Sequence, residues 1–298
     1  MTIFYFTGTG NSLYVAKKLA GETGKLVSIP QVIDSDTAIY KDDIIGVVFP
    51  IYAFNPPLMV KKFLDKVTLQ ADYIFAIGTM GAAAGSCMRF VQKRVLKAGY
   101  RFDYVNSIKM VDNYLPLFDI AKQKKTLAKK CVDDCLNKIK IDIDNKIARV
   151  EGGFFPIIST PVTLLSGYGF DPSSKVKKYS CLETCNKCGV CAKVCPTGNI
   201  RVGEDGVSFC VKCEYCLACL HHCPQGALHH KKEKSGMRWR HPEVTLEEII
   251  TANNRNCNKE IKCETVCEGA KAVTECCKTQ ISECNIKVDG EIYDLPKE

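Results

Sequence analysis

The sequence predicts a doubly wound α/β domain with a parallel sheet, followed by a small α+β domain. Apolar, β-rich runs alternate with amphipathic stretches through the first half of the chain, as in α/β folds. Two closely similar cysteine motifs then follow in the second half. We expect four segments: the α/β domain 1–145, a linker 146–174, the cysteine-motif domain 175–232, and a short helix with a cysteine-rich tail over 233–298.

The first strand is predicted at residues 2–6, a continuous apolar run typical of a buried parallel strand. It leads into Thr7-Gly-Thr-Gly-Asn-Ser12, and apolar residues then recur at helical spacing up to Gly21. A strand, a glycine- and hydroxyl-rich loop and a helix suit a phosphate, because loop N–H groups and the helix N-terminus attract negative charge. The loop matches neither the nucleoside-triphosphate nor the dinucleotide fingerprint. An ordinary glycine-rich turn is the alternative.

Four further strands and their helices continue the alternation. The strands are expected at 25–29, 43–49, 72–77 and 100–105, and helices at 56–65, around 88–96 and at 119–140. The carboxyl ends of parallel strands meet at one edge, where α/β sheets bind their ligands. Loops 7–12, 50–55 and 78–85 are therefore expected to converge.

Loop 7–12 resembles the loop that holds the FMN phosphate in flavodoxins. The resemblance covers about residues 1–145 and implies a five-stranded sheet in the order 2-1-3-4-5, with FMN at the switch point. The expected phosphate residues are the side-chain donors Thr7, Thr9, Asn11 and Ser12, with Gly8 and Gly10 for close backbone approach. The other two loops would flank the flavin ring, with Tyr52 preferred to Phe54 for stacking. Their expected flavin residues are Pro50, Tyr52, Phe54, Gly78, Thr79, Met80 and Gly81. A surface aromatic and a ligand-free glycine turn are the alternatives.

Residues 185–196 and 213–224 both read Cys-x2-Cys-x2-Cys-x3-Cys-Pro. This is the bacterial spacing for iron–sulfur clusters, in which the fourth cysteine of each motif ligates the other cluster. One [4Fe–4S] cluster is expected on Cys185, Cys188, Cys191 and Cys223. The second is expected on Cys195, Cys213, Cys216 and Cys219. Zinc, which also uses Cys-x2-Cys pairs, is the alternative, but it does not account for the third and fourth cysteines of each motif.

The segment 175–231 resembles bacterial-type two-cluster ferredoxins. The resemblance fits a hairpin over 200–209 with its turn at Asp205-Gly206, and a closing strand at 227–230. Cys181 departs from the pattern, either as a small buried neighbour of the cluster or as an alternative ligand. Taken together, the chain to about residue 250 is similar to the flavodoxin-fused two-cluster ferredoxins of anaerobic bacteria and archaea.

Several stretches outside the motifs have simpler predictions. Cys87 is expected to be a small packing residue at a helix start, and Cys131 and Cys135 share one face of the last α/β helix. The basic stretch 231–240 is expected to be a solvated connector, with nucleic-acid contact as the alternative. A capping box, Thr245 with Glu248, predicts a helix from 246 to about 251.

The linker 146–174 is interrupted by glycine and proline and is expected to pack on one or both domains, with membrane contact as the alternative. The tail beyond 253 carries cysteines in no known metal spacing. It is expected to be a loose extension with inert thiols, or else a further metal site.

Composition places the chain among globular proteins. It has 298 residues, 46% apolar and 25% charged, and no eighteen-residue apolar run, so no membrane span is expected. The start lacks the basic region of a signal peptide, and thiolate clusters need a reducing compartment, so we expect a cytoplasmic location. The net charge of +8 falls to about +2 once two clusters and a flavin phosphate are counted. The reduced net charge disfavours nucleic acid as a partner. The remaining surplus of basic residues suits an acidic redox protein as the partner.

The predicted function is an electron relay between redox partners, two [4Fe–4S] clusters and FMN. Clusters move one electron at a time, whereas a flavin takes one or two. An FMN-dependent reductase fed by the clusters, and an iron–sulfur redox sensor, are the alternatives. No nicotinamide fingerprint and no DNA-reading motif is present in the sequence.

Overall fold

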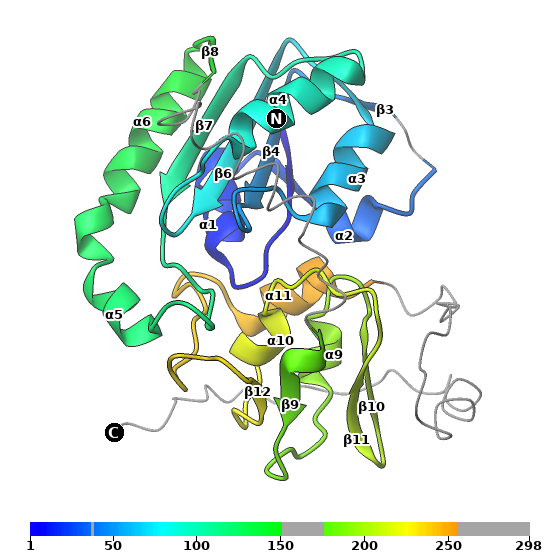
Figure 1. The fold of residues 1–298 in the computed structure, drawn as a ribbon. Coiled ribbons are helices and arrows are strands. Elements are labelled where there is room, and N and C mark those ends of the chain that lie inside the picture. Colours follow the sequence, from blue (N-terminus) through cyan, green and yellow to red (C-terminus); the bar gives the residue numbers. More distant parts are fainter. Residues whose placement is uncertain (37–38, 151–175, 256–298) are drawn as a thin grey trace. The chain divides into compact units, whose positions relative to one another are not determined.

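A computed structural model describes residues 1–36, 39–150 and 176–255 (Figure 1). Residues 1–256 form one compact unit, so contacts within it can be described together. Most of the predicted linker, and the cysteines of the predicted tail, lie outside the described residues. Within the described part, no helix is long and apolar enough to cross a bilayer.

A parallel sheet forms the centre of the α/β part, in the order β2-β1-β4-β6-β7-β8. Its strands are β1 (Thr2–Tyr5), β2 (Lys25–Ser28), β4 (Ile44–Pro50), β6 (Tyr73–Met80), β7 (Tyr104–Lys109) and β8 (Arg149–Val150). Two short strands, β3 (Ile39–Lys41) and β5 (Thr68–Gln70), pair with each other outside it. The described residues thus give this sheet six strands where five were expected, because β8 adds an edge strand beside β7.

The strand expected at 100–105 begins only at Tyr104. Phe102 is held by a side chain, whereas the Asp103 N–H already donates to the Ile74 carbonyl of β6 (2.7 Å). Gln92 donates from Nε2 to the carbonyl of Phe102 (3.0 Å) and accepts from its N–H (3.1 Å). These bonds satisfy the backbone before the ladder starts.

Seven short helical segments accompany the sheet among the described residues. They are α1 (Asn11–Ala20), α2 (Ile29–Val32), α3 (Leu58–Lys66), α4 (Cys87–Lys97), α5 (Ile120–Lys125), the 3₁₀ turn η1 (Ala128–Lys130) and α6 (Val132–Asp144). The single helix predicted at 119–140 is therefore wrong. The backbone of Cys131 is left-handed (φ 46°), so the 3₁₀ turn η1 ends there and α6 begins at the next residue. Lys130 Nζ meanwhile bonds the carbonyl of Met110, fixing the bend.

The core consists of strand residues buried on both faces, as the continuous apolar runs predict. Phe4, Phe49 and Phe75 are fully buried. Gly46 faces the Phe75 ring so closely that a Cβ would lie 2.2 Å from it. A glycine is therefore required at the centre of β4.

The cysteine-rich part is built from two small antiparallel pairs and two one-turn helices. Strand β9 (Tyr179–Cys181) pairs with β12 (Leu228–His230), and β10 (Ile200–Gly203) pairs with β11 (Gly206–Phe209). The helices are α9 (Val190–Lys193) and α10 (Ala218–His221). The predicted hairpin is present, but Glu204 and Asp205 join its strands, one residue earlier than expected.

The last described helix is α11 (Leu246–Asn253), and its predicted capping box is confirmed. The Thr245 hydroxyl accepts from the Glu248 N–H, and the Glu248 carboxylate accepts from the Thr245 N–H. The solvated connector expected at 231–240 is wrong for its second half, because Trp239 is only 3% exposed. The stretch from Arg238 to Asn253 instead packs onto the sheet loops, and is called the strap below.

Candidate functional site

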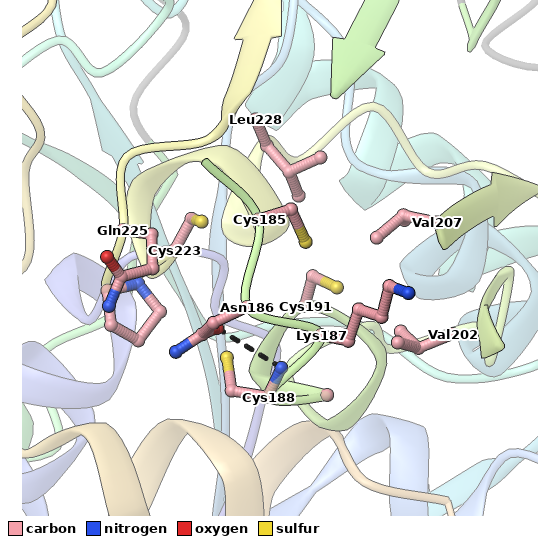
Figure 2. A pocket seen from close by; sticks show the side chains of 12 residues that line it. Cys185, Asn186, Lys187, Cys188, Cys191, Val202, Val207, Cys223, Gln225 and Leu228 are labelled. Carbon is pink, nitrogen blue, oxygen red and sulfur yellow. Dashed lines mark hydrogen bonds between the residues drawn. The ribbon is translucent and has the colours of Figure 1, made fainter. Parts of the chain in front are cut away.

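The first cysteine group consists of Cys185, Cys188, Cys191 and Cys223, which line one cavity (Figure 2). Left-handed backbone at Lys187 (φ 58°) and Gly189 (φ 75°) curls the chain tightly between the first three cysteines. Cys223 follows α10, so it comes from the other motif. Apolar side chains of the β10–β11 hairpin, Val202 and Val207, complete the wall.

The second cysteine group consists of Cys195, Cys213, Cys216 and Cys219. Burial raises the pKa of Cys216 and Cys219 well above the usual range, and the charges of the neighbouring thiols in this group raise it further. The four thiols therefore lie near one another. Left-handed backbone at Tyr215 and Leu217 curls this loop as in the first group.

Backbone N–H groups donate hydrogen bonds to cysteine sulfurs of both groups. Asn199 N–H donates to Cys195 Sγ (3.2 Å), and Tyr215 N–H donates to Cys213 Sγ (3.2 Å). Ala227 N–H donates to Cys223 Sγ (3.3 Å). Such bonds stabilise anionic sulfur and are one of the means by which proteins set cluster potentials.

Both groups fit a [4Fe–4S] cluster in donor chemistry. Each offers four thiols in a largely apolar setting, and burial raises the pKa of Cys191 and of Cys213 to about 12. Such thiols keep their protons until a cation displaces them, as cluster iron does. Among the described residues, no set of three or more His, Cys, Asp or Glu side chains is placed to bind a single metal ion.

Cys181 lies beside the first group and hydrogen-bonds the Cys185 side chain. Its pKa is raised to about 11, by burial first and then by Cys185 and Cys223. It is half-buried, so it is a neighbour of the first group without being enclosed by it. Both interpretations from the sequence, packing residue and alternative ligand, remain compatible with this position.

The three sheet loops expected to bind a flavin do meet. Ser12 Oγ and Thr79 Oγ1 are 2.8 Å apart, and a Cβ on Gly8 would lie 3.1 Å from Tyr52 Oη. Phe54 packs against Gly85 at the far end of the third loop. The convergence at the carboxyl edge of the sheet is the one that the strand order predicts.

The side chains expected to donate to a phosphate are already hydrogen-bonded within the protein. Asn11 donates to the Val111 carbonyl (3.1 Å) and accepts from Trp239 Nε1 (3.0 Å). Thr9 Oγ1 accepts from Asn113 Nδ2. Thr7 Oγ1 accepts from the Gly10 N–H (3.0 Å).

The two loop glycines are also covered by protein. A Cβ on Gly8 would lie 2.9 Å from the Cys216 carbonyl, and one on Gly10 would lie 3.1 Å from His241 and Val244. The space left by the missing side chain of each glycine is therefore occupied by other residues of this protein. As arranged here, Gly8 is covered by the second cysteine motif and Gly10 by the strap, so the loop does not fit a flavin phosphate unless both segments move, and FMN stays a prediction.

The residues expected to flank the flavin ring also contact protein. Tyr52 is half-buried, and desolvation, followed by the charges of Cys216 and Glu214, raises its pKa well above the usual range. Beyond Pro50, which ends β4, Ala53 and Phe54 are left-handed in a tight turn closed between Tyr52 and Asn55.

The glycines of the third loop lie close to side chains. Gly78 lies against Ile51 and Met88, and Gly81 lies against Asp112. Met80, at the end of β6, is half-buried. Whether any of these residues touches a flavin stays a prediction.

Sequence reasoning missed the residues that join the two parts of the molecule. Asn253 Nδ2 donates to the Thr7 carbonyl (3.1 Å) and to the Val194 carbonyl (3.2 Å). His221 shares a hydrogen bond with the Asn113 carbonyl (2.8 Å). No periodicity or motif marks these residues, because their partners are backbone carbonyls far away in sequence.

Glu214, between two cysteines of the second group, was also missed. Its carboxylate accepts from the N–H groups of Leu58 and Met59 at the start of α3. Carboxylates are favoured there because a helix N-terminus exposes unpaired N–H groups. Burial nevertheless raises its pKa to about 7.

His241 anchors the strap on α1. Its ring stacks on Tyr14 with the ring centroids 3.9 Å apart, and its backbone N–H donates to the Thr9 carbonyl (2.9 Å). Burial lowers its pKa to about 4. The charged groups around it are Glu243 and Asp133, which raise the pKa, and Lys17 and Lys18, which lower it.

Comparison with known proteins supports the cysteine part of this description. The 4Fe-4S binding domain family matches residues 182–201. A 90-residue stretch is 36% identical to the polyferredoxin protein MvhB of Methanothermus fervidus. That match covers 28% of this chain, and the chain spans about a fifth (19%) of the relative's length.

Solved structures resemble the α/β part more distantly. A flavodoxin from Megasphaera elsdenii is 18% identical, with 36% of this chain and 83% of the flavodoxin covered and a TM-score of 0.26. An FMN-dependent NADH-azoreductase from Bacillus anthracis is 10% identical, with 47% and 99% covered and a TM-score of 0.30. Likenesses at these scores carry no argument about a cofactor or an activity.

The fold and the two cysteine groups define an iron–sulfur protein with an α/β part. The strand order of the sheet is that of flavodoxin-like folds, with β8 added at one edge. The chain thus joins an α/β domain with a flavodoxin-like strand order to a cysteine-rich part that contains a match to the 4Fe-4S binding domain family.

Proposed function

We propose that this chain is an electron-transfer protein that holds two [4Fe–4S] clusters and passes electrons between redox proteins. The observation that carries the proposal is the cavity lined by three cysteines of the first motif and by Cys223 of the second. The repeated motif spacing predicts the reciprocal arrangement for Cys195 with Cys213, Cys216 and Cys219. Each motif would then contribute to both sites.

The chain's own residues provide what such a protein needs. The thiols of each group would bind one cluster, which supplies single-electron transfer when bound. Backbone N–H groups stabilise the sulfur charge, and apolar walls such as Val202 and Leu228 limit water around the first group. Charge placed on a buried cluster is more costly in apolar surroundings, so these contacts set the potential.

FMN as a third carrier, and the relay through it, stay predictions. The strand–loop–helix at 7–12 favours them, whereas the contacts of Asn11 and Gly10 with the strap oppose them. A reductase or a redox sensor would share the same clusters, and no described contact favours either over electron transfer.

Cofactor content tests the proposal. We expect about eight iron and eight sulfide per chain in anaerobically purified, reconstituted protein. Replacing a cysteine of either group, Cys188→Ala or Cys216→Ala, should remove about four of the eight iron atoms. Cys87→Ala and Cys131→Ala, outside both groups, are the matched controls and should keep all eight.

Three other outcomes would contradict the proposal or change it. Stoichiometric zinc without sulfide would refute the clusters. About one FMN per chain alongside eight iron would restore the predicted relay and require the strap to leave loop 7–12. Tight, redox-dependent binding of a partner without any electron turnover would indicate a sensor.

A further inference from the structure

We propose that the two clusters have different fixed roles, an inference that rests on the proposed function. The cluster on the first cysteine group exchanges electrons with partner proteins. The cluster on the second group is the inner carrier, enclosed between the cysteine-rich part and the carboxyl edge of the α/β sheet. Electrons would therefore pass between partner and sheet edge by way of the first cluster and then the second.

Exposure differs between the two groups. In the first, Cys188 is exposed, Cys185 and Cys223 are half-buried and Cys191 is buried. In the second, none of the four is exposed: Cys195 and Cys213 are half-buried, and Cys216 and Cys219 are buried. A partner's redox centre can approach the first group more closely than the second, and electron transfer weakens steeply with distance.

The residues that cover the second group come from the α/β part. The Cys216 carbonyl and the Tyr52 hydroxyl both lie against Gly8, where an added Cβ would be 2.9 Å and 3.1 Å from them. Glu214 bonds the start of α3. The loops that would bind a ligand at the sheet edge are thus placed directly beside the inner cluster.

The rim of the first group indicates what kind of partner would dock there. Five exposed residues line its cavity, and only one of them, Lys187, carries a formal charge (Figure 2); the others are Asn186, Cys188, Pro224 and Gln225. The Lys187 ammonium is already bonded to the Glu204 carbonyl (2.6 Å). This surface fits a protein with an exposed redox centre that binds through a small, weakly charged contact, as transient electron-transfer partners do.

Iron release from the holoprotein tests the order of the clusters without changing a cysteine. Reduced protein is mixed anaerobically with bathophenanthroline disulfonate, a chelator that competes for exposed iron. We expect two phases of about four iron each, with rates at least tenfold apart. The fast phase would belong to the first group and the slow phase to the second.

Gly8→Ala assigns the phases. Its Cβ would press on the Cys216 carbonyl, so it should speed the slow phase at least threefold and leave the fast phase within twofold. Gly236→Ala is the matched control, because a Cβ there meets no atom within 4 Å. It should leave both phases as in the wild type.

Cys188→Ala provides a second assignment, by loss of the fast phase alone. A single phase of eight iron, or a Gly8→Ala protein in which only the fast phase accelerates, would overturn the assigned roles while leaving the proposed function standing. Protein that holds no iron before the chelator is added would overturn the proposed function, and the inference with it.

Discussion

Asn253→Ala should weaken the attachment of the cysteine-rich part to the sheet. Asn253 is fully buried at the end of α11, and its single amide nitrogen donates to two carbonyls. One belongs to Thr7 of loop 7–12, and the other belongs to Val194 next to Cys195. The residue therefore links strap, sheet and cluster segment at one point.

The cost can be worked out from these contacts. Leaving a buried carbonyl without its donor costs about 1–3 kcal/mol, and we take the lower end for each of the two. The cavity left by the amide adds about 1 kcal/mol. Two effects reduce this loss. Asn253 Oδ1 has no hydrogen-bond partner among the described residues, so its removal also removes the cost of burying an unpaired polar atom. Alanine is the better helix former by about 0.5 kcal/mol. We expect a net loss of about 2 kcal/mol.

Thermal unfolding under anaerobic conditions measures this loss. For a folded unit of this size, about 2 kcal/mol corresponds to a drop of about 4–8 °C in Tm. Asn254→Ala is the matched control, because its neighbouring contacts with Gln31 and Ile250 are made by backbone atoms that alanine keeps. A Tm for Asn253→Ala within about 1 °C of that control would refute the argument that this amide joins the two parts.

Three further predictions concern single contacts. The pKa of His241 is lowered to about 4, so its neutral form stabilises the folded state fully above about pH 6.5. The thermal unfolding midpoint should therefore fall as the pH drops from about 6.5 to 4. His241→Gln should reduce this dependence of the midpoint on pH. Trp239→Phe keeps a ring but loses the bond to Asn11, so a urea titration should show a loss of about 1 kcal/mol, with Trp239→Tyr no better. Lys130→Met removes a donor to two loop carbonyls and should lower Tm by several degrees, whereas Lys129→Met should not, in a parallel melt.

Local sequence patterns were enough for the elements whose cause is local. Continuous apolar runs marked the buried strands, the repeated cysteine spacing marked the cluster segment, and Thr245 with Glu248 marked the start of α11. Each depends on residues within a few positions of one another. The curl of the first motif also has a local cause, because the left-handed turns at Lys187 and Gly189 need only neighbouring residues.

Patterns failed where distant residues decide the structure. The helix predicted at 119–140 is interrupted because Lys130 bonds carbonyls at the sheet edge. The stretch 231–240, whose last residues begin the strap, was expected to be a solvated connector because basic residues surround Trp239. The hydrogen-bond partner of Trp239, Asn11, lies 228 positions away in the sequence. Helical propensity and charge carry no information about such contacts.

Gly8 shows why a motif can be recognised while its occupant stays open. A phosphate loop needs glycine so that a ligand can approach the backbone. Here the same absence of a side chain lets the Cys216 carbonyl approach. Both demands select the same residue, so the sequence alone cannot separate them. The contact nevertheless has a functional consequence: whatever occupies loop 7–12 lies beside Cys216, a proposed ligand of the second cluster, so we expect a change at either site to affect the other.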